Sequence, residues 1–587
     1  MTIEWLHPGL LLILGAWGVP FLKGRVKQLG MLLLPGAALA ICLHMTPGTY
    51  GQINFLGQEL VFGRVDKLSL IFSYVFSIMA FIGMIYALHV RDDVQHVSTL
   101  IYAGGALGIT FAGDFLTLLV FWEIIAISSA LLVWQRRKPA AVAAGFRYLM
   151  FHVAGGLILL TGIVLHWFET GSVAFVQMEG SSNGVAWAMI LVAILLNAAV
   201  PPLGAWLPDA YPEATATGAV FMTAFTTKSA VYVLIRGFAG TELLVWLGAA
   251  MAVYGVVYAV LENDARRLLA YHIISQVGYM VCGVGIGTSL ALNGASAHAF
   301  AHILYKALLF MGAGAVLQVT GLRKLSEMGG LYRTMPVTLG LYMVGAFAIS
   351  AVPLFSGFVS KSMIVSAAGE SHRAIIFLVL TLASAGTFLH TGLKLPYYMF
   401  FGKKSGVRGQ EPPRNMLVAM GLAATICILI GVFPGLLYRY LPNDAAYAPY
   451  TLQHVTSTLG MLSFTALGFF LLLKYLDPES KISLDTDWFY RRLLAPLVTI
   501  TQGVLTRVET NYVGEIYNWR MRLLWRQGAL LRKFDRKIVD FAAVGVGRLV
   551  QTLSGTLKIT VSGNAQHYGL IIAAGVLALL MLAIFLP

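Results

Sequence analysis

Seven ionisable side chains lie inside long apolar stretches of this sequence, and they are its clearest candidates for chemistry. These residues are Glu123, Lys228, His298, His302, Lys306, His390 and Lys394. A charged group at the middle of a membrane-spanning helix costs roughly 2.5–3.5 kcal/mol on insertion scales, so each one calls for a functional reason. Spacings of four residues place His298, His302 and Lys306 on one face of a helix, and the same spacing joins His390 to Lys394. The pattern predicts a buried line of groups that exchange protons.

Each of these residue types suits proton relay. Burial disfavours a charged ammonium group, so a buried lysine can bind and release a proton near neutral pH. Histidine titrates near pH 6.5, at about the physiological range, and can pass protons through either ring nitrogen. Neighbouring hydroxyls such as Ser128, Ser129, Thr226, Thr227 and Ser275 are suited to hold water between the sites. Protonation of one group would then change the proton affinity of the next.

Structural roles compete with this interpretation. Glu123 and Lys228 would also fit a static ion pair, and His298 would fit a packing role in the core. Lys361 is expected near a membrane edge, where a lysine can extend its ammonium group to the surface. Three residues beside the interrupted helices are accessory candidates, namely Asn197, Asp209 and Lys361.

The composition requires a membrane. The chain is 58% hydrophobic and 11% charged, with a mean hydropathy of +0.78, whereas soluble domains carry roughly 25% charged residues. Apolar runs of about 20 residues match the thickness of the hydrocarbon core. We expect an all-α polytopic membrane protein with about sixteen transmembrane helices, at residues 8–22, 29–45, 66–89, 98–113, 115–134, 145–168, 185–206, 216–236, 244–261, 268–288, 294–319, 336–352, 372–401, 415–436, 456–476 and 567–586.

Several chemistries have no support in the sequence. Cys42, Cys282 and Cys427 fall singly in apolar segments, so we expect neither disulfides nor zinc nor iron–sulfur clusters. No G-x-x-x-x-G-K-[ST] loop and no dinucleotide-binding glycine fingerprint is present. We therefore predict no cofactor, no bound metal and no redox chemistry in this chain. The first apolar run, 9–21, is expected to be a retained helix rather than a signal peptide.

The basic residues are distributed unevenly between alternate loops. Seventeen Lys and Arg residues fall in one set of loops and six in the other. By the positive-inside rule, the first set faces the cytoplasm, which places the N-terminus and the C-terminus outside. The net charge of +14 is then explained by topology, with no nucleic-acid partner.

Prolines interrupt two of the predicted spans in a similar way. The breaks are AAVPPLGAWLPDAYPEAT at 198–215 and AVPLFSGFVSK at 351–361. Paired interruptions in two halves of a chain indicate an inverted-repeat transporter with its ion path at the breaks. We expect N-terminal helices at 1–97, a first five-helix repeat at 98–240, a second inverted repeat at 241–402, further core helices at 403–476, a lateral segment at 477–566 and a final anchor at 567–587. Lys228 and Lys394 then occupy the last helix of each repeat.

The segment at 477–566 differs from the rest of the chain because it is rich in arginine. It carries an apolar stripe at helical spacing, made of Trp519, Leu523, Leu530, Phe534, Ile538 and Phe541. An apolar stripe opposite a basic face suits a helix that lies along the membrane surface or along a neighbouring subunit. The alternative is a soluble cytoplasmic linker.

Several longer motifs resemble one known family. They are WLPDAYPEAT at 206–215, TTKSAVYVLIR at 226–236, DARRLLAYHIISQVGYM at 264–280, HILYKALLF at 302–310, SGFVSK at 356–361 and LDTDWFYR at 484–491. This set resembles the antiporter-like subunits of respiratory complex I, membrane-bound hydrogenases and Mrp-type Na⁺/H⁺ antiporters, with the D-type proteins of the Mrp branch as the nearest likeness. The resemblance implies a central polar axis through Glu123, Lys228, Lys306 and Lys394, a half-channel to each face, and membrane subunits as partners.

The chain departs from that family pattern in its first half. Asn197 stands where many members have a lysine, and Gly204 and Met222 stand where histidines are common. Asparagine cannot carry a proton as lysine does, so Lys228 is the remaining candidate partner of Glu123.

We therefore expect a proton-conducting subunit of a multisubunit cation-translocating complex in a prokaryotic plasma membrane, with H⁺ as the transported ion and Na⁺ as a second candidate. One alternative is a mainly structural subunit with a degenerate first half-channel, in which Glu123 and Lys228 are replaceable. Another is a self-sufficient secondary cation/H⁺ antiporter, for which a long lateral segment has no use. The sequence leaves the transported ion, the direction and the energy source open.

Overall fold

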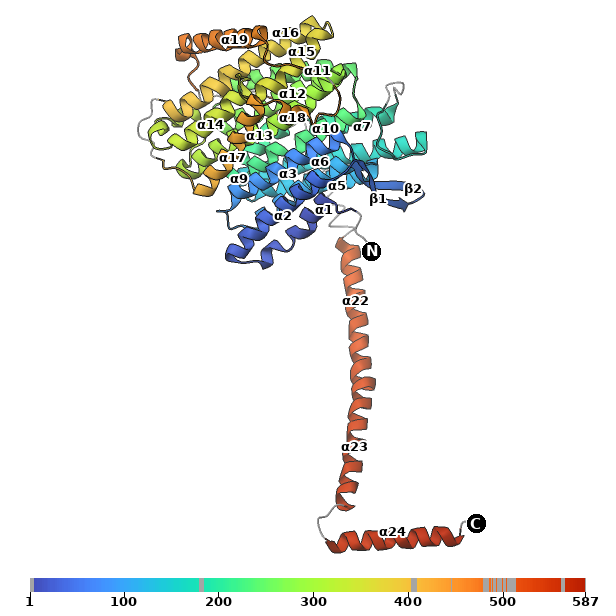
Figure 1. The fold of residues 1–587 in the computed structure, drawn as a ribbon. Helices are drawn as coiled ribbons and strands as arrows, with labels where there is room; N and C mark the ends of the chain where they lie inside the picture. Colours follow the sequence, from blue (N-terminus) through green and yellow to red (C-terminus); the bar gives the residue numbers. More distant parts are fainter. Residues whose placement is uncertain are drawn as a thin grey trace. The chain divides into compact units, whose positions relative to one another are not determined.

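The computed structural model describes residues 5–178, 184–402, 409–444, 446–478, 485–486, 488, 492, 499, 503, 514–560 and 565–585. The chain divides into two compact units, Met1–Asp487 and Trp488–Pro587. The first unit is a bundle of helices, and the second contains the helices α22, α23 and α24 (Figure 1). Residues 403–408 and most of the LDTDWFYR motif lie outside the described residues.

The N-terminal part of the first unit contains a β-hairpin among its helices. Here α1 (Pro8–Ala16), α2 (Gly24–His44) and α3 (Lys67–Ala87) accompany the antiparallel strands β1 (Gly48–Phe55) and β2 (Gln58–Val65). Leu56 and Gly57 form the turn with positive φ angles of 52° and 76°, as a two-residue type I′ hairpin requires. The expectation of an entirely α-helical chain is wrong at this point, because the 48–65 connection pairs with itself.

The centre of the first unit contains two successive series of helices. The first comprises α4 (Asp93–Phe111), α5 (Phe115–Trp134), α6 (Pro139–Thr170), α7 (Val185–Asn197), α8 (Trp206–Ala210), η2 (Tyr211–Glu213), α9 (Ala216–Ala224) and α10 (Thr226–Gly237). The second comprises α11 (Glu242–Leu261), α12 (Ala265–Ile286), α13 (Ser289–Thr320), α14 (Pro336–Ile349), α15 (Ser356–Glu370), α16 (Ala374–Thr387) and the π-helical turns η5 (Phe388–Lys394) and η6 (Tyr397–Phe401).

Helix ends recur at matching positions in the two series. Helices α6 and α13 both have 32 residues, start 150 positions apart, and end at a left-handed glycine, Gly171 or Gly321. Helices commonly end at a glycine in the left-handed backbone conformation, because glycine has no Cβ atom that would clash there. The same chain path therefore occurs twice in this unit.

The helix starts recur in the same way. Asp114 caps α5 and pairs with Ala174, whereas Asp264 caps α12 and pairs with Lys324. Both members of each pair differ from their counterparts by 150 positions. The helix starts therefore recur at the same spacing as the helix ends, while the two repeats expected from the sequence stay a prediction.

Both predicted helix interruptions are present. Helix α7 ends at Asn197 and α8 begins at Trp206, while α14 ends at Ile349 and α15 begins at Ser356. Proline has no N–H group and cannot continue a helical ladder. The structure adds a third interruption, at Phe225, which divides the predicted span 216–236 into α9 and α10.

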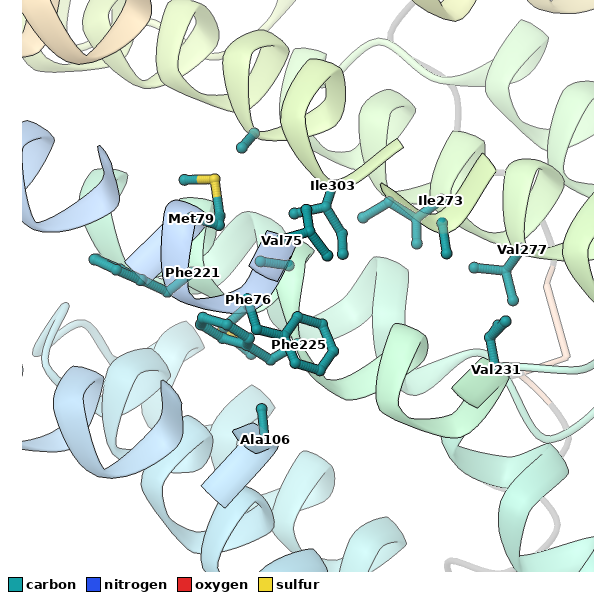
Figure 2. Close-up of a cluster of buried hydrophobic side chains, with 14 of the residues drawn as sticks. Val75, Phe76, Met79, Ala106, Phe221, Phe225, Val231, Ile273, Val277 and Ile303 are labelled. Atoms are coloured by element: carbon teal, nitrogen blue, oxygen red, sulfur yellow. The ribbon is translucent and has the colours of Figure 1, made fainter. Parts of the chain in front are cut away.

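The apolar core surrounds this third interruption. Figure 2 shows Phe221 and Phe225 beside Val75, Phe76 and Met79 of α3, with Ile273 and Val277 of α12 and Ile303 of α13 nearby. The rings of Phe76 and Phe225 meet edge to face, with their centroids 5.4 Å apart. Tight apolar packing on both sides fixes the position at which α10 starts.

Eleven helices among the described residues are long and apolar enough to cross a membrane. Three shorter apolar helices, at Val185–Asn197, Pro336–Ile349 and Gln566–Leu582, coincide with further predicted spans. The remaining two predicted spans coincide with α1, of 9 residues, and α4, of 19. The structure therefore shows many apolar helices, while the count of sixteen crossings stays a prediction.

Helices α17 (Arg414–Val432), α18 (Gly435–Tyr438) and α19 (Leu452–Leu471) follow the two series. Asp485 completes this unit by accepting hydrogen bonds from Tyr254 of α11 and from Tyr271 of α12, the latter at 2.5 Å. In the second unit, α22 (Gly514–Phe534), η9 (Asp535–Val539) and α23 (Asp540–Thr560) form one nearly continuous rod, and α24 (Ala565–Phe585) follows it (Figure 1). At about 1.5 Å per residue, the rod is roughly 70 Å long.

Candidate proton path

Lys228 lies at the third helix interruption. Its side chain is completely buried, and its Nζ donates to the carbonyl of Thr223 at 2.7 Å and to the Thr227 hydroxyl at 3.1 Å. Thr223 belongs to the last turn of α9, so Lys228 bridges the two sides of the interruption. The sequence suggested an ion pair between Glu123 and Lys228, and this pair is not formed in the structure. Both hydrogen bonds of the Lys228 ammonium instead go to residues of α9 and α10.

Helix α13 carries the next group of ionisable residues. His298, His302 and Lys306 are fully buried. Within the described part of the chain, neither ring nitrogen of His302 nor the Nζ of Lys306 has a hydrogen-bond partner. Lys228 lies within electrostatic range of both residues. Unpartnered buried nitrogens are costly, and a site that exchanges protons through water is one explanation for them.

His298 differs because its ring is hydrogen-bonded on both sides. Nδ1 lies 3.1 Å from the Ser360 hydroxyl of α15, and Nε2 lies 3.2 Å from the amide oxygen of Gln276 on α12. Tyr305 also approaches Nε2, at 3.4 Å. His298 therefore connects α13 to the helix that follows the second proline interruption.

His272 and His390 extend the line away from α13. His272 is within electrostatic range of Lys306, and its ring centroid lies 6.4 Å from that of His390. No partner is present for either nitrogen of His272 among the described residues. His390 and Lys394 occupy η5, a π-helical turn, and such turns occur frequently at functional sites. The Nζ of Lys394 donates to the Val260 carbonyl at 2.6 Å and ends the line.

Lys361 is buried, in contrast to the position expected at a membrane edge. It lies on α15 with 2% of its surface exposed, its Nζ donates to Ser384 at 3.0 Å, and it stands 5.0 Å from the centre of the Tyr279 ring. Helix α15 resumes after the proline interruption and carries this lysine into the protein. A cavity of about 200 Å³ adjoins it, lined among others by Ser362, Ser384, His454 and Thr458.

The first half holds the other candidates. One carboxylate oxygen of Glu123 is buried and has no partner among the described residues, and the same is true of the Asn197 amide oxygen. Asp209 instead forms a two-pronged ion pair with Arg147, at 2.7 and 2.9 Å. This geometry suits a structural clamp between α6 and α8.

Sequence reasoning missed two buried histidines. His272 and His152 are single histidines in apolar helices, and each is almost completely buried. His152 occupies in α6 the position that His302 occupies in α13, 150 residues later. Aligning the two halves by their glycine ends would have found it.

Several motif residues are structural rather than chemical. Glu213 accepts hydrogen bonds from Arg136 at 2.9 Å and from Arg323 at 2.6 Å, and Arg323 also pairs with Asp264. Arg266 donates to the three carbonyls of Tyr211, Ala214 and Thr215, at 3.0–3.1 Å. These contacts fasten the two halves together where η2 meets α12. Among the described residues, no group of His, Cys, Asp and Glu side chains is arranged to hold a metal ion.

Comparisons with known proteins identify the family of the chain. A family model described as NADH:quinone oxidoreductase/Mrp antiporter, TM, matches residues 112–387. A Na(+)/H(+) antiporter subunit of Alkalihalophilus pseudofirmus is 30% identical, over 57% of this chain and 72% of its own length. The chain belongs to this antiporter-like family.

This antiporter-like protein also resembles a second curated relative and a solved structure. A probable K(+)/H(+) antiporter subunit of Rhizobium meliloti is 30% identical over 68% of this chain but only 44% of its own length, so the chain spans less than half of that relative. A solved chain of the membrane-bound sulfane sulfur reductase, an archaeal respiratory membrane complex, has the same fold, with a TM-score of 0.66 and 24% identity. That match covers 78% of this chain and 98% of the other.

Proposed function

We propose that this chain is the proton-conducting subunit of a multisubunit cation-translocating membrane complex. Protons move along a buried line that runs from Lys228 through His302 and Lys306 to His272, His390 and Lys394. Lys361 and His298 form a branch from this line toward the cavity beside α15. The transported protons are exchanged for a cation or driven by a partner subunit.

One observation carries this proposal. Six ionisable side chains with at most 4% of their surface exposed follow one another through the first unit, and four of them hold nitrogens without a partner among the described residues. A static core has no reason to keep such groups, since each costs about 1–3 kcal/mol when unsatisfied. Groups that must change protonation state need that freedom.

The repeated chain path supports an inverted-repeat architecture. In such transporters the path lies at the interface of the repeats and beside broken helices. Lys228 lies at the interruption between α9 and α10, whereas Lys361 and Ser360 lie just after the one that precedes α15. We further propose that both termini face outward, as the distribution of basic residues predicts.

The exposed apolar stripe on the second unit supports the proposal that this chain has partner subunits. Its six residues are between 41% and 75% exposed. Exposed apolar surface of this extent marks an interaction site. We propose that neighbouring membrane subunits cover this stripe.

The second candidate function is a mainly structural role, and specific residues and contacts of the first half favour it. Asn197 replaces a lysine of the family pattern, and Asp209 is held by Arg147. The two functions differ in their response to Lys228→Ala in membrane vesicles that contain the whole complex. A proton-conducting subunit loses coupled transport while every subunit still co-purifies. A structural subunit retains transport at the normal rate, which would refute the proposed function.

The self-sufficient antiporter is tested by purifying this chain through a tag in mild detergent and identifying the co-purifying proteins. We expect further membrane subunits. Transport by the isolated chain in liposomes would contradict the proposal. An iron assay on the same sample distinguishes a redox-driven complex from an antiporter.

A further inference from the structure

Helix α6 of the first half carries His152, a buried histidine that the proposed line does not use. His152 is 1% exposed, and neither of its ring nitrogens has a hydrogen-bond partner within the described residues. It stands at the α6 position that matches His302 in α13. The two halves therefore place a buried histidine at the same point of the same long helix.

The helices differ one turn further on. Four residues after His302, α13 carries Lys306, whereas α6 carries Gly156 four residues after His152. A Cβ atom at Gly156 would overlap Oε1 of Glu123, which enters from α5. The absence of a side chain at Gly156 thus makes room for the Glu123 carboxylate. Because residues four apart share a helix face, that carboxylate lies on the face of α6 that carries His152, one turn further along the helix.

Other groups complete the surroundings of His152. From α7, Asn197 lies close to the ring, and its amide oxygen also has no hydrogen-bond partner among the described residues. From α8, Trp206 packs edge to face at 4.6 Å, and Tyr148 of α6 does so at 4.1 Å. The charged groups of α8 and η2 are engaged elsewhere, since Asp209 pairs with Arg147 and Glu213 pairs with Arg136 and Arg323. Glu123 is therefore the acidic group that enters beside α6 at Gly156.

Hydroxyl groups connect this cluster to the main line. The Tyr148 hydroxyl lies 2.8 Å from Ser129 and also interacts with Thr226. Thr226 is bound to Tyr102 at 2.6 Å and precedes Thr227, whose hydroxyl accepts from Lys228. A row of side-chain hydroxyls thus leads from the neighbourhood of His152 to the beginning of the buried line.

We infer that His152, together with Glu123 across Gly156, is a second proton-carrying site in the first half, beside Lys228. This inference rests on the proposed function and adds to it the residues of the first half-channel. A proton received by His152 passes toward Lys228 along the hydroxyl row, while Glu123 stabilises the imidazolium form.

The test uses vesicles that contain the whole complex and compares four variants. His152→Gln keeps polarity but cannot carry a proton, so we expect transport to fall at least fivefold and to depend less steeply on pH than in the wild type. Gly156→Ala displaces the Glu123 carboxylate, and we expect a comparable loss. Gly155→Ala is the matched control, because its added Cβ would meet only Leu196, at an ordinary 3.4 Å, and we expect near-normal transport. Lys306→Ala reports on the proposed function itself.

The outcomes separate the two ideas. If Lys306→Ala abolishes transport but His152→Gln retains the normal rate and pH profile, His152 is not a carrier and the proposed function stands. A lower rate with an unchanged pH profile would make His152 a packing residue and would also overturn the inference. If the complex with His152→Gln fails to assemble, the comparison of Gly156→Ala with Gly155→Ala tests the inference. Equal transport by these two variants overturns the inference. Full transport by Lys306→Ala overturns the proposed function and the inference together.

Discussion

His152 and His302 occupy the same position in two helices of equal length, and the residue one turn later sets their different chemistry. In α13 that residue is Lys306, with no partner for its ammonium group among the described residues. In α6 it is Gly156, which leaves the space to Glu123. The two helices therefore place a lysine one turn after the histidine in one case and leave room for a carboxylate there in the other.

Lys394 is expected to be essential for coupled transport. Its ammonium group ends the buried line at the Val260 carbonyl, so Lys394→Ala should reduce proton translocation at least tenfold in vesicles that contain the complex. Lys474→Ala, at an exposed position in the turn after α19, is the control and should transport normally. Equal rates for the two variants would remove Lys394 from the path.

The Asp66–Arg236 pair predicts a loss of stability in acid. Asp66 lies just outside the span of α3 and receives two hydrogen bonds from Arg236, at 2.8 and 2.9 Å. Burial raises the pKa of the Asp66 carboxyl, but the bonds from Arg236 outweigh this effect and lower the pKa below its usual value. A carboxylate with a lowered pKa stabilises the folded state above its unfolded pKa of about 3.9, and this contribution disappears as the pH falls through the lowered value.

Thermal unfolding of the detergent-purified protein measures this effect. Between about pH 6 and pH 3, the melting temperature of the wild type should fall more than that of Asp66→Asn, which has already lost the ion pair. Asp93→Asn removes a more exposed pair with Lys27 and should retain the wild-type pH dependence. Parallel curves for wild type and Asp66→Asn would contradict the assignment.

Asp485 is expected to stabilise the second series of helices. Its buried carboxylate joins Tyr254 of α11 to Tyr271 of α12, and hydrogen bonds to charged groups contribute roughly 1.5–3 kcal/mol each. Asp485→Ala should therefore lower the melting temperature, whereas Asp444→Ala, with a side chain 99% exposed, should not. A melting temperature unchanged in Asp485→Ala would show that the tyrosines do not depend on this carboxylate.

The apolar stripe of the second unit should hold partner subunits. Replacement of Leu523, Phe534 and Phe541 by serine removes exposed apolar surface from α22 and α23, and we expect fewer subunits to co-purify with the tagged chain. Arg532→Ser changes the basic side of the same helix and serves as the control. Unchanged co-purification in the triple variant would show that the stripe is not the interface.

Much of the fold was predictable because apolar length and proline carry strong physical signals. Runs of about 20 apolar residues fixed the membrane class, and Pro201 and Pro353 marked two interruptions. The β-hairpin was missed because 48–65 was treated as a connection, although Leu56–Gly57 lies between two strand-like segments. The interruption at Phe225 has no proline, and the packing of Phe221 and Phe225 against α3 is a tertiary effect that the local sequence does not reveal.

The site was predictable wherever charge and spacing agreed. His298, His302 and Lys306 were found because their spacing shows a single helix face. The burial of Lys361 was not foreseen, since a lysine after an interruption can equally reach a membrane edge. His152 and His272 carry no local signal, because one histidine in an apolar helix resembles a packing residue. The predicted ion pair of Lys228 with Glu123 was wrong. The Thr223 carbonyl becomes available to Lys228 only because the helix is interrupted at Phe225, and the local sequence does not reveal that interruption.

The most direct test of the central claim is proton translocation by vesicles that contain the complex with Lys306→Ala, Lys306→Arg or the control Lys324→Ala. Lys324 lies on a loop and pairs with Glu327 at 3.5 Å, so its variant should transport normally. We predict that Lys306→Ala and Lys306→Arg both abolish coupled transport while all subunits co-purify, because arginine keeps the charge but cannot release a proton. Normal transport by an assembled Lys306→Ala complex would contradict the buried line as the proton path.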